Sequence, residues 1–275
     1  MKYEESLQIV LDYIEENLYE DMDLNRLASV AGYSKYHFLR VFKEAFHMTP
    51  SEYVRRRRIT ESACDIADTE EPISQIGYKH GFNSKENFTR AFKLEHRILP
   101  SDYRLVDNSL KLLHRNKAES GVFVLVPRII ELKPFCAMVY KCDEEEPAKF
   151  WNKYNCGGLS GKLSGGDAQL DYGFSVWNYE KNKLDYYIGI LSRYARGDIS
   201  GAMELNVEGG LYAVFDTPKA NKYTFVNTIH RTWNYINREW SSQSKFVRLG
   251  DCDFETYREN SREFSEQIYI HIKWK

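Results

Sequence analysis

Apolar side chains recur at helical spacing through the first hundred residues. Leu24, Leu27 and Ala28 lie three or four positions apart, and a second run begins shortly after Gly32. Gly32 permits a backbone with positive φ, and Ser34 can cap the helix that follows. In that helix the apolar positions fall at i, i+3, i+4 and i+7, on one face: Phe38, Val41, Phe42 and Ala45. The pattern predicts a helix, a tight turn and a second helix.

This pattern is repeated about fifty residues later. Residues 31–43 (AGYSKYHFLRVFK) return as residues 80–93 (HGFNSKENFTRAFK), with one extra residue in the second turn near Asn83. Phe88, Ala91 and Phe92 form the apolar stripe of the second copy. An internal repeat of this kind indicates a duplicated structural unit.

The face opposite each apolar stripe is polar and mostly basic. In a helix-turn-helix the second helix enters the major groove of DNA. The predicted DNA-contacting residues are Lys35, Tyr36, Leu39, Arg40 and Lys43 in the first copy and Lys85, Glu86, Thr89, Arg90 and Lys93 in the second. One helical hairpin with a basic face is a common structural element, whereas two tandem copies with equivalent basic positions favour DNA binding.

Residues 8–104 resemble the DNA-binding domain of AraC/XylS-type transcription regulators. The resemblance rests on Gly81-Phe82-x-Ser84-x-x-x-Phe88-x-Arg90-x-Phe92-Lys93, on Pro100-x-x-Tyr103-Arg104 and on Arg58-Ile59-x-x-x-Ala63. It implies two helix-turn-helix units joined by a long helix, reading successive major grooves on one face of the duplex. The chain departs from the family pattern at His47 and Arg97, where Gly is usual, at Gly77 in place of Ala, and at Leu99 in place of Thr.

Charge must be considered locally to locate the DNA-binding surface. The whole chain has a formal net charge of −2, but residues 24–104 contain 14 Lys and Arg against 10 Asp and Glu. Phosphate binding depends on the face presented, so we expect a modest basic stripe. Residues 55–58 form the densest basic cluster, which is interpreted either as a phosphate-binding surface or as a solvated helix face. We assign phosphate contact to Arg57 and a structural role to Arg58.

Composition changes sharply between Asp107 and Gly121. We predict a DNA-binding domain over residues 1–108, a linker or short helix over 109–120, and a second domain over 121–275. The second domain contains all five Trp and most of the other aromatic residues, and its charges balance. It is therefore not expected to be a second DNA-binding surface.

Apolar segments of the second domain predict the order strand, helix, strand, strand, twice over. The first set covers residues 122–140, 147–154, 172–179 and 184–191, and the second covers 211–216, 223–239, 253–257 and 267–273. The predicted fold class is multidomain: an all-α tandem helix-turn-helix domain, then an α+β domain with a curved sheet and helices on one side.

Residues 121–275 resemble the GyrI-like effector-binding domain found behind several AraC-type DNA-binding domains. The residues that carry this resemblance are the segments 210–215, 253–257 and 266–270, together with Trp233. The resemblance implies two repeats facing each other across a central cleft. An acidic residue there would meet cationic, lipophilic or aromatic ligands.

Strand alternation selects the candidate pocket acid. It places Phe254 on one face of its strand and Glu255 and Tyr257 on the other, so Glu255 is the first choice and Glu266 the second. Aromatic walls would add apolar area and cation–π attraction. The aromatic candidates for ligand contact are Tyr257, Trp151, Tyr154, Trp177, Tyr187, Phe215 and Trp233. The alternatives are a solvated strand carboxylate and ordinary core packing of each ring.

No catalytic or metal-binding pattern is recognisable in the sequence. The five cysteines are scattered without metal-ligand spacing, and the glycine-rich segment 157–166 lacks the order of a phosphate loop. We therefore predict a cytoplasmic, non-enzymatic transcription regulator without cofactor, metal or membrane association. Its expected partners are double-stranded DNA, a small-molecule effector and RNA polymerase. The alternatives are that the second domain hydrolyses a small molecule, or that it binds a protein and no effector.

Overall fold

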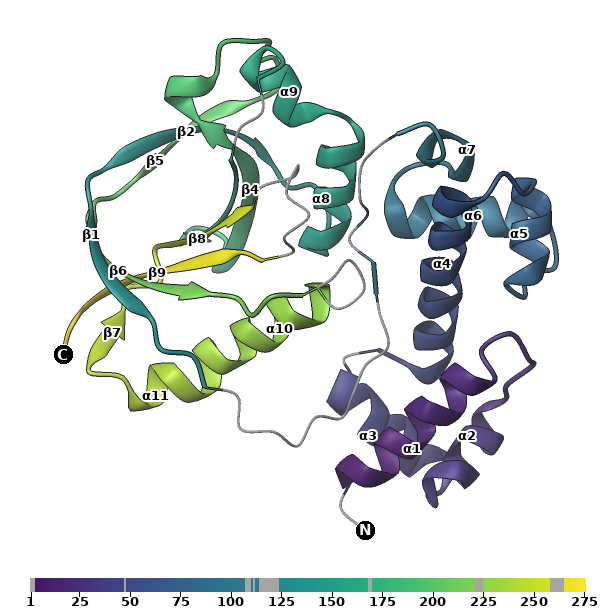
Figure 1. Ribbon diagram of the computed structural model, residues 1–275. Helices are drawn as coiled ribbons and strands as arrows, with labels where there is room; N and C mark the ends of the chain where they lie inside the picture. The colour runs from purple at the N-terminus through teal and green to yellow at the C-terminus, as the bar shows by residue number, and fades with distance from the viewer. Residues whose placement is uncertain are drawn as a thin grey trace. The chain divides into compact units, whose positions relative to one another are not determined.

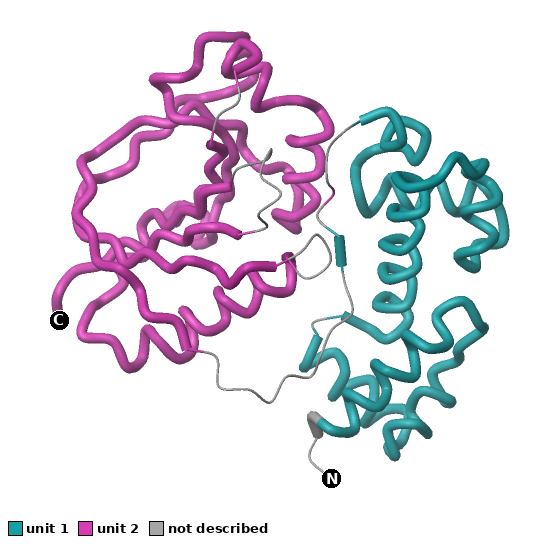
Figure 2. The backbone as a smooth tube through the Cα atoms, viewed as in Figure 1, with its two compact units in different colours: residues 1–107, 112–122 teal, residues 108–111, 123–275 magenta. Residues whose placement is uncertain are grey.

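The computed structural model describes residues 3–46, 48–106, 110, 112–113, 124–167, 170–220, 225–257 and 265–275. The chain forms two compact units, coloured separately in Figure 2. One comprises residues 1–107 with 112–122, and the other comprises residues 108–111 with 123–275. The first unit is helical and the second is rich in strands, which confirms the predicted multidomain class. None of the described helices is long and apolar enough to cross a membrane.

The described part of the first unit contains two helix-turn-helix pairs joined by a long helix (Figure 1). The first pair is α2 and α3, the second pair is α5 and α6, and α4 connects them. The helices are α1 (Tyr3–Glu16), α2 (Leu24–Ala31), α3 (Lys35–Phe46), α4 (Pro50–Asp68), α5 (Ile73–Lys79), α6 (Lys85–His96) and α7 (Pro100–Tyr103).

Glycine and serine set the turn in each pair. Gly32 ends α2 with a φ of 72°, and Gly81 follows α5 with a φ of 76°. The hydroxyl of Ser84 accepts a hydrogen bond of 3.1 Å from the backbone N–H of Asn87, which caps α6. A glycine with positive φ therefore precedes the second helix of each pair, α3 or α6, which we call the recognition helix.

The structure explains two of the departures from the usual family pattern. Arg97 ends α6 in the left-handed conformation with a φ of 62°, which costs a non-glycine residue about 1–2 kcal/mol. A Cβ atom on Gly77 would lie 2.9 Å from the ring of Phe88, so glycine lets α5 and α6 pack closely. His47, the equivalent of Arg97 in the first copy, lies outside the described residues.

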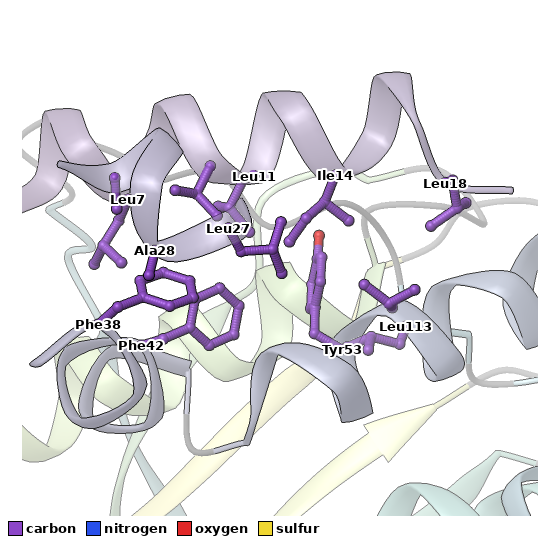
Figure 3. Close-up of a cluster of buried hydrophobic side chains, with 13 residues drawn as sticks. Leu7, Leu11, Ile14, Leu18, Leu27, Ala28, Phe38, Phe42, Tyr53 and Leu113 are labelled. Carbon is purple, nitrogen blue, oxygen red and sulfur yellow. The ribbon is translucent and has the colours of Figure 1, made fainter. Parts of the chain in front are cut away.

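A buried cluster holds α1 against the first helix-turn-helix. Figure 3 shows side chains of α1, α2 and α3 pointing toward one another, with Tyr53 of α4 and Leu113 beside them. The predicted apolar stripe of α3 is buried at Phe38 and Phe42, but Ala45 is exposed. Phe46 packs against the cluster in its place, because it lies one turn beyond Phe42.

The expected phosphate contact of Arg57 is wrong, because its side chain is buried inside the first unit. Only 4% of Arg57 is exposed. Its Nε and Nη2 donate to the two carboxylate oxygens of Glu15 at 2.8 Å, and Nη2 also bonds Glu61 at 2.8 Å. Its Nη1 donates to the carbonyl of Leu113 at 3.1 Å. Arg57 therefore fastens α4 to α1 and cannot reach DNA from this position.

The neighbouring arginines also bind within the unit. Arg58 donates to the carbonyl oxygens of Leu18 at 2.7 Å and Glu20 at 2.9 Å, which agrees with the structural role expected for it. Arg56 Nε lies 2.7 Å from the buried carboxylate of Glu95 in α6. Residues 55–58 thus fix α1, the segment that follows it, and α6 to α4.

The second unit contains one antiparallel sheet that is strongly curved in Figure 1. Its strands follow the order β1-β6-β9-β8-β3-β4-β2-β5, and β7 pairs with β9. The strands are β1 (Arg128–Leu132), β2 (Phe135–Lys141), β3 (Asp171–Asn178), β4 (Lys183–Leu191), β5 (Met203–Val207), β6 (Gly210–Asp216), β7 (Phe246–Arg248), β8 (Cys252–Tyr257) and β9 (Gln267–Trp274). The helices are α8 (Pro147–Cys156), α9 (Leu159–Ser164), α10 (Phe225–Tyr235) and α11 (Ser241–Gln243), with a π-helical turn at Ile236–Trp240 and a 3₁₀ turn at Ser192–Tyr194.

The predicted duplication is confirmed in this unit. One repeat is β2-α8-β3-β4 and the other is β6-α10-β8-β9, and they meet where β3 pairs with β8. The single strand expected over residues 122–140 is instead two strands, since Pro134 has no N–H to continue a ladder. β1 pairs with β6 of the second repeat, and β5 pairs with β2 of the first. The repeats are thus linked by exchanged strands.

The two faces of the sheet have different coverings. On one face, Ile188 and Tyr257 pack with Phe150 of α8 and Phe225 of α10, while Ile268, Ile270 and Ile272 pack with α10 and the turn that follows it. The opposite face carries its own aromatic cluster, which includes Phe135, Tyr172, Phe174, Tyr212, Phe254 and Tyr269. Alternation along β8 therefore sends Phe254 to one cluster and Tyr257 to the other, as predicted.

The Arg57 ion pair yields a stability prediction. Replacing Arg57 with Ala leaves the Glu15 carboxylate buried without its counter-charge, so the free energy of unfolding should fall by about 3–5 kcal/mol. Urea denaturation followed by far-ultraviolet circular dichroism measures the loss. Arg55→Ala is the matched control, because the Arg55 side chain is 37% exposed and lies 3.8 Å from its nearest carboxylate oxygen. Equal stability of the two variants would contradict the assignment.

Candidate functional site

The recognition helix of the first copy presents a polar, basic surface. Lys35, Tyr36, Arg40 and Lys43 are exposed on α3, and Leu39 is half-buried. Tyr36 is 86% exposed, which is unusual for a large aromatic side chain. Phe38 and Phe42 anchor the other face of α3, so the helix is held rigidly while these side chains remain available.

The second copy repeats this arrangement on α6. Lys85, Glu86, Arg90 and Lys93 are exposed, and Thr89 is half-buried. The pattern of exposure at the five positions is the same as on α3, position by position. All ten residues predicted to contact DNA on the two recognition helices therefore have at least partly accessible side chains.

A side chain three positions earlier supports the central arginine of each recognition helix. Nη2 of Arg40 lies 3.4 Å from Nδ1 of His37, and Nη2 of Arg90 donates to the amide oxygen of Asn87 at 3.0 Å. His37 and Asn87 occupy equivalent positions in the two copies. Such contacts orient a guanidinium before it meets a base, which reduces the entropy lost on binding.

In the second unit, the predicted pocket acid lies at the centre of the sheet. Glu255 of β8 is directly opposite Gly173 of β3, at the junction of the two repeats. Only 8% of Glu255 is exposed. One carboxylate oxygen accepts a hydrogen bond from the hydroxyl of Tyr186. The other accepts one of 3.3 Å from Nε1 of Trp233 on α10.

Tyr186 connects this carboxylate to α8. Its hydroxyl accepts a hydrogen bond of 2.8 Å from Nε1 of Trp151 and donates to Glu255. Burial and the Glu255 charge raise the pKa of Tyr186 well above its usual range, and the charge of Glu266 acts in the same direction. The phenol therefore keeps its proton and remains a donor to Glu255 at physiological pH.

Glu255 has no cationic partner among the described residues, although a similar acid nearby does. Asp253 lies on the same face of β8, and Nε of Arg248 donates to it at 2.7 Å. The same guanidinium lies 5.9 Å from the ring centroid of Trp233, near the edge of the site. Its positive charge is paired with Asp253. A buried carboxylate without a counter-charge is costly, and such groups cluster at functional sites.

The structure brings some of the predicted pocket residues to Glu255. Trp233 donates a hydrogen bond to Glu255, and Trp151 is linked to Glu255 through Tyr186. The ring of Tyr257 is 5.7 Å from that of Trp151. Tyr154 packs against Trp151 from the next turn of α8. Glu266 is buried just before β9, where its backbone N–H donates to the hydroxyl of Thr217.

The predicted pocket roles of Tyr187, Phe215 and Trp177 have no support in the structure. Tyr187 faces the opposite side of the sheet from Glu255, because alternation along β4 gives the site-facing position to Tyr186. Phe215 is fully buried against Trp240 in a separate cluster. Trp177 is half-buried near the end of β3, and no described contact joins it to Glu255.

Sequence reasoning missed Tyr186 and Gly173. A Cβ atom on Gly173 would lie 2.2 Å from the hydroxyl oxygen of Tyr186 and 2.9 Å from a carboxylate oxygen of Glu255. Glycine is therefore required for the phenol to pass over β3 and reach the acid. The pair Tyr186-Tyr187 was visible in the sequence, but no local signal shows which of two adjacent tyrosines faces the helices.

These two surfaces define a DNA-binding protein with a separate effector-binding domain, and comparisons with known proteins agree. Residues 27–105 match a helix-turn-helix domain family, and residues 128–272 match the integron-associated effector binding protein family. The regulatory protein SoxS of Salmonella typhimurium is 34% identical over 104 residues, which are 38% of this chain and 97% of SoxS. The transcriptional activator AarP of Providencia stuartii is 40% identical over 107 residues, 38% of this chain and 79% of AarP.

Solved structures resemble parts of the chain more distantly. SAV2435 bound to tetraphenylphosphonium gives a TM-score of 0.43 at 16% identity and covers 54% of this chain and 93% of its own. The sequence matches show that the chain belongs to the AraC-type transcriptional regulators and carries a C-terminal domain of the integron-associated, GyrI-like effector-binding family.

The requirement for Gly173 can be tested by overpacking. Gly173→Ala should lower the free energy of unfolding by about 1–3 kcal/mol, because Tyr186 or the backbone of β3 must move. It should also change the fluorescence of Trp151, whose indole N–H bonds Tyr186. Gly161→Ala is the control, since a Cβ there meets nothing within 4 Å. An unchanged spectrum and stability for Gly173→Ala would show that Tyr186 is not held over β3.

Proposed function

We propose that this regulator reads a specific promoter sequence with α3 and α6 and senses a lipophilic organic cation at Glu255. One observation carries the effector proposal: the Glu255 carboxylate is buried, and all its described hydrogen-bond partners are neutral donors. An incoming cation would supply the missing counter-charge. An anion would be repelled by Glu255 and by the nearby Glu266 charge that also acts on Tyr186.

The surrounding aromatic rings favour a lipophilic cation over a hydrated metal ion. Trp151 and Tyr257 offer apolar area, and Tyr186 and Trp233 are half-buried groups at the border of the site. Aromatic faces attract cations by about 0.5–2 kcal/mol, more when water is excluded. Because Trp233 lies on α10, a cation that takes over its contact with Glu255 would act directly on this helix.

The DNA-binding proposal follows from the two equivalent recognition helices. A tandem pair of helix-turn-helix units can occupy two successive major grooves, about one helical turn apart. One chain would then bind one asymmetric site of roughly twenty base pairs. We propose that it acts on promoter DNA in the cytoplasm and that RNA polymerase is its protein partner.

Hydrolysis of the bound molecule is the alternative that the site itself suggests. A carboxylate bonded to a phenol could act on a reactive ligand as a general base, and the Trp151–Tyr186–Glu255 chain has this form. Mass spectrometry of the ligand after incubation with the protein separates the two functions. Unchanged ligand with altered transcription supports sensing, whereas turnover that Glu255→Gln abolishes supports hydrolysis.

Base recognition is tested at Arg40. Arg commonly pairs with the O6 and N7 atoms of guanine, so Arg40→Ala should lose about 1–3 kcal/mol on the specific site and relax the sequence preference there. Lys43→Ala, at the last turn of the same helix, should weaken specific and random DNA alike. Fluorescence anisotropy with both DNAs at several salt concentrations measures the effects. An equal loss for Arg40→Ala on both DNAs would remove its base-reading role.

Charge selection is tested at Glu255. Glu255→Gln keeps the shape of the side chain and should weaken phenyltrimethylammonium binding by about 1–3 kcal/mol. Binding of its neutral isostere tert-butylbenzene should hardly change. Tryptophan fluorescence follows both ligands, because all five Trp lie beyond residue 120. Equal weakening of the two ligands would mean that Glu255 only supports the fold, and selectivity lost in Glu266→Gln alone would reassign the acid.

A further inference from the structure

A second buried carboxylate lies on the same face of the sheet as Glu255. Asp171 begins β3 and has no exposed surface. Its Oδ1 accepts a hydrogen bond of 2.8 Å from the hydroxyl of Tyr154, and the hydroxyl group of Ser160 acts to lower the pKa of this carboxyl group. Its Oδ2 has no hydrogen-bond partner among the described residues. One buried oxygen of Asp171 is therefore unsatisfied.

The strand register places Asp171 diagonally across from Glu255. Asp171 is opposite Tyr257, and Gly173 is opposite Glu255, so these four residues form one square on adjacent strands. Their side chains share a face, and diagonal positions in such a square are roughly 7–8 Å apart. Gly173 contributes no side chain, and the hydroxyl group of Tyr186 passes over it to reach Glu255.

Aromatic rings of α8 connect the two acids. Trp151 bonds Tyr186, which bonds Glu255, and Tyr154 bonds Asp171. The rings of Trp151 and Tyr154 are 5.8 Å apart, and both residues are buried. One helix thus presents neighbouring aromatic side chains to both carboxylates, and a single flat ligand could lie against it.

Like Glu255, and unlike Asp185 and Asp253, Asp171 has no counter-charge among the described residues. Asp185 of β4 lies 2.7 Å from Nζ of Lys141, and Asp253 of β8 is paired with Arg248. No cation of the described residues acts on Asp171, and burial raises the pKa of its carboxyl group to about 6. Neither carboxyl group at the centre of the site therefore has a cation beside it among the described residues.

We propose that Asp171 is a second cation subsite, so that the preferred effector carries two positive groups joined by a flat aromatic spacer. This inference rests on the proposed function of Glu255. The two subsites differ in chemistry. Both oxygens of Glu255 already accept hydrogen bonds, which suits a quaternary cation held by charge and aromatic contact. The free Oδ2 of Asp171 suits an ammonium group that donates an N–H.

Two matched compounds test the second subsite on the full chain. (4-Aminomethyl)benzyltrimethylammonium carries a quaternary centre and a primary ammonium roughly 7 Å apart, the spacing of diagonal sheet positions. (4-Ethylbenzyl)trimethylammonium has the same shape with one charge. By isothermal titration calorimetry, the wild-type chain should bind the dication at least about tenfold more tightly, as a buried charge-assisted contact provides. Asp171→Asn should abolish this preference and weaken the monocation much less than the dication.

The outcomes distinguish the Asp171 subsite from the Glu255 site on which it rests. If the monocation binds and Glu255→Gln weakens it, but the wild-type chain does not prefer the dication, the Asp171 subsite is overturned and the Glu255 site stands. If neither compound binds, the proposed effector site itself fails. Moving the aminomethyl group to the 2-position of the ring should remove the preference without any substitution.

Discussion

The hydrogen-bonded pairing of β3 with β8 is the contact on which the effector domain depends. It joins the two repeats at the middle of the sheet and sets the register that places Gly173 opposite Glu255. A shift of one residue would turn Glu255 to the other face, among the rings of Phe135, Phe254 and Tyr269. The exchanged strands β1 and β5 add a second link between the repeats, which makes such a shift costly.

The two units of the chain use arginine in opposite ways. On α4, arginines are turned inward: Arg57 is buried against Glu15, and Arg58 donates to backbone carbonyls. On α3 and α6, Arg40 and Arg90 are exposed, and each contacts a polar group one turn earlier. Arg57 and Arg58 fix α1 and the segment after it to α4, whereas Arg40 and Arg90 remain accessible on α3 and α6. A count of basic residues cannot distinguish these roles.

The helical unit was largely predictable from its sequence because its signals are local. Apolar spacing, Gly32, Gly81 and Ser84 specify each helix-turn-helix within about twenty residues. The error at Arg57 arose inside a run of four arginines, where residue type says nothing about direction. The i, i+4 relation of Tyr53 and Arg57 was the available signal, since both side chains bond Glu15.

The effector site was only partly predictable, because it is assembled from distant strands and helices. Alternation around Glu255 correctly separated Phe254 from Tyr257, since that pattern is local to β8. The choice between Tyr186 and Tyr187 required knowing which face of β4 the helices cover. Asp171 and Gly173 became recognisable as site residues only when the pairing of β3 with β8 was known. Long-range register, rather than residue type, was the missing information.

We propose that an organic cation supplies the counter-charge that Glu255 lacks among the described residues. A crystal structure with tetraphenylarsonium tests this most directly, because the anomalous scattering of arsenic locates the positive centre. We expect an arsenic peak within roughly 6 Å of the Glu255 carboxylate, the range over which opposite charges interact strongly in proteins. A peak on the opposite face of the sheet, with Glu255 still bonded to both Tyr186 and Trp233, would contradict it.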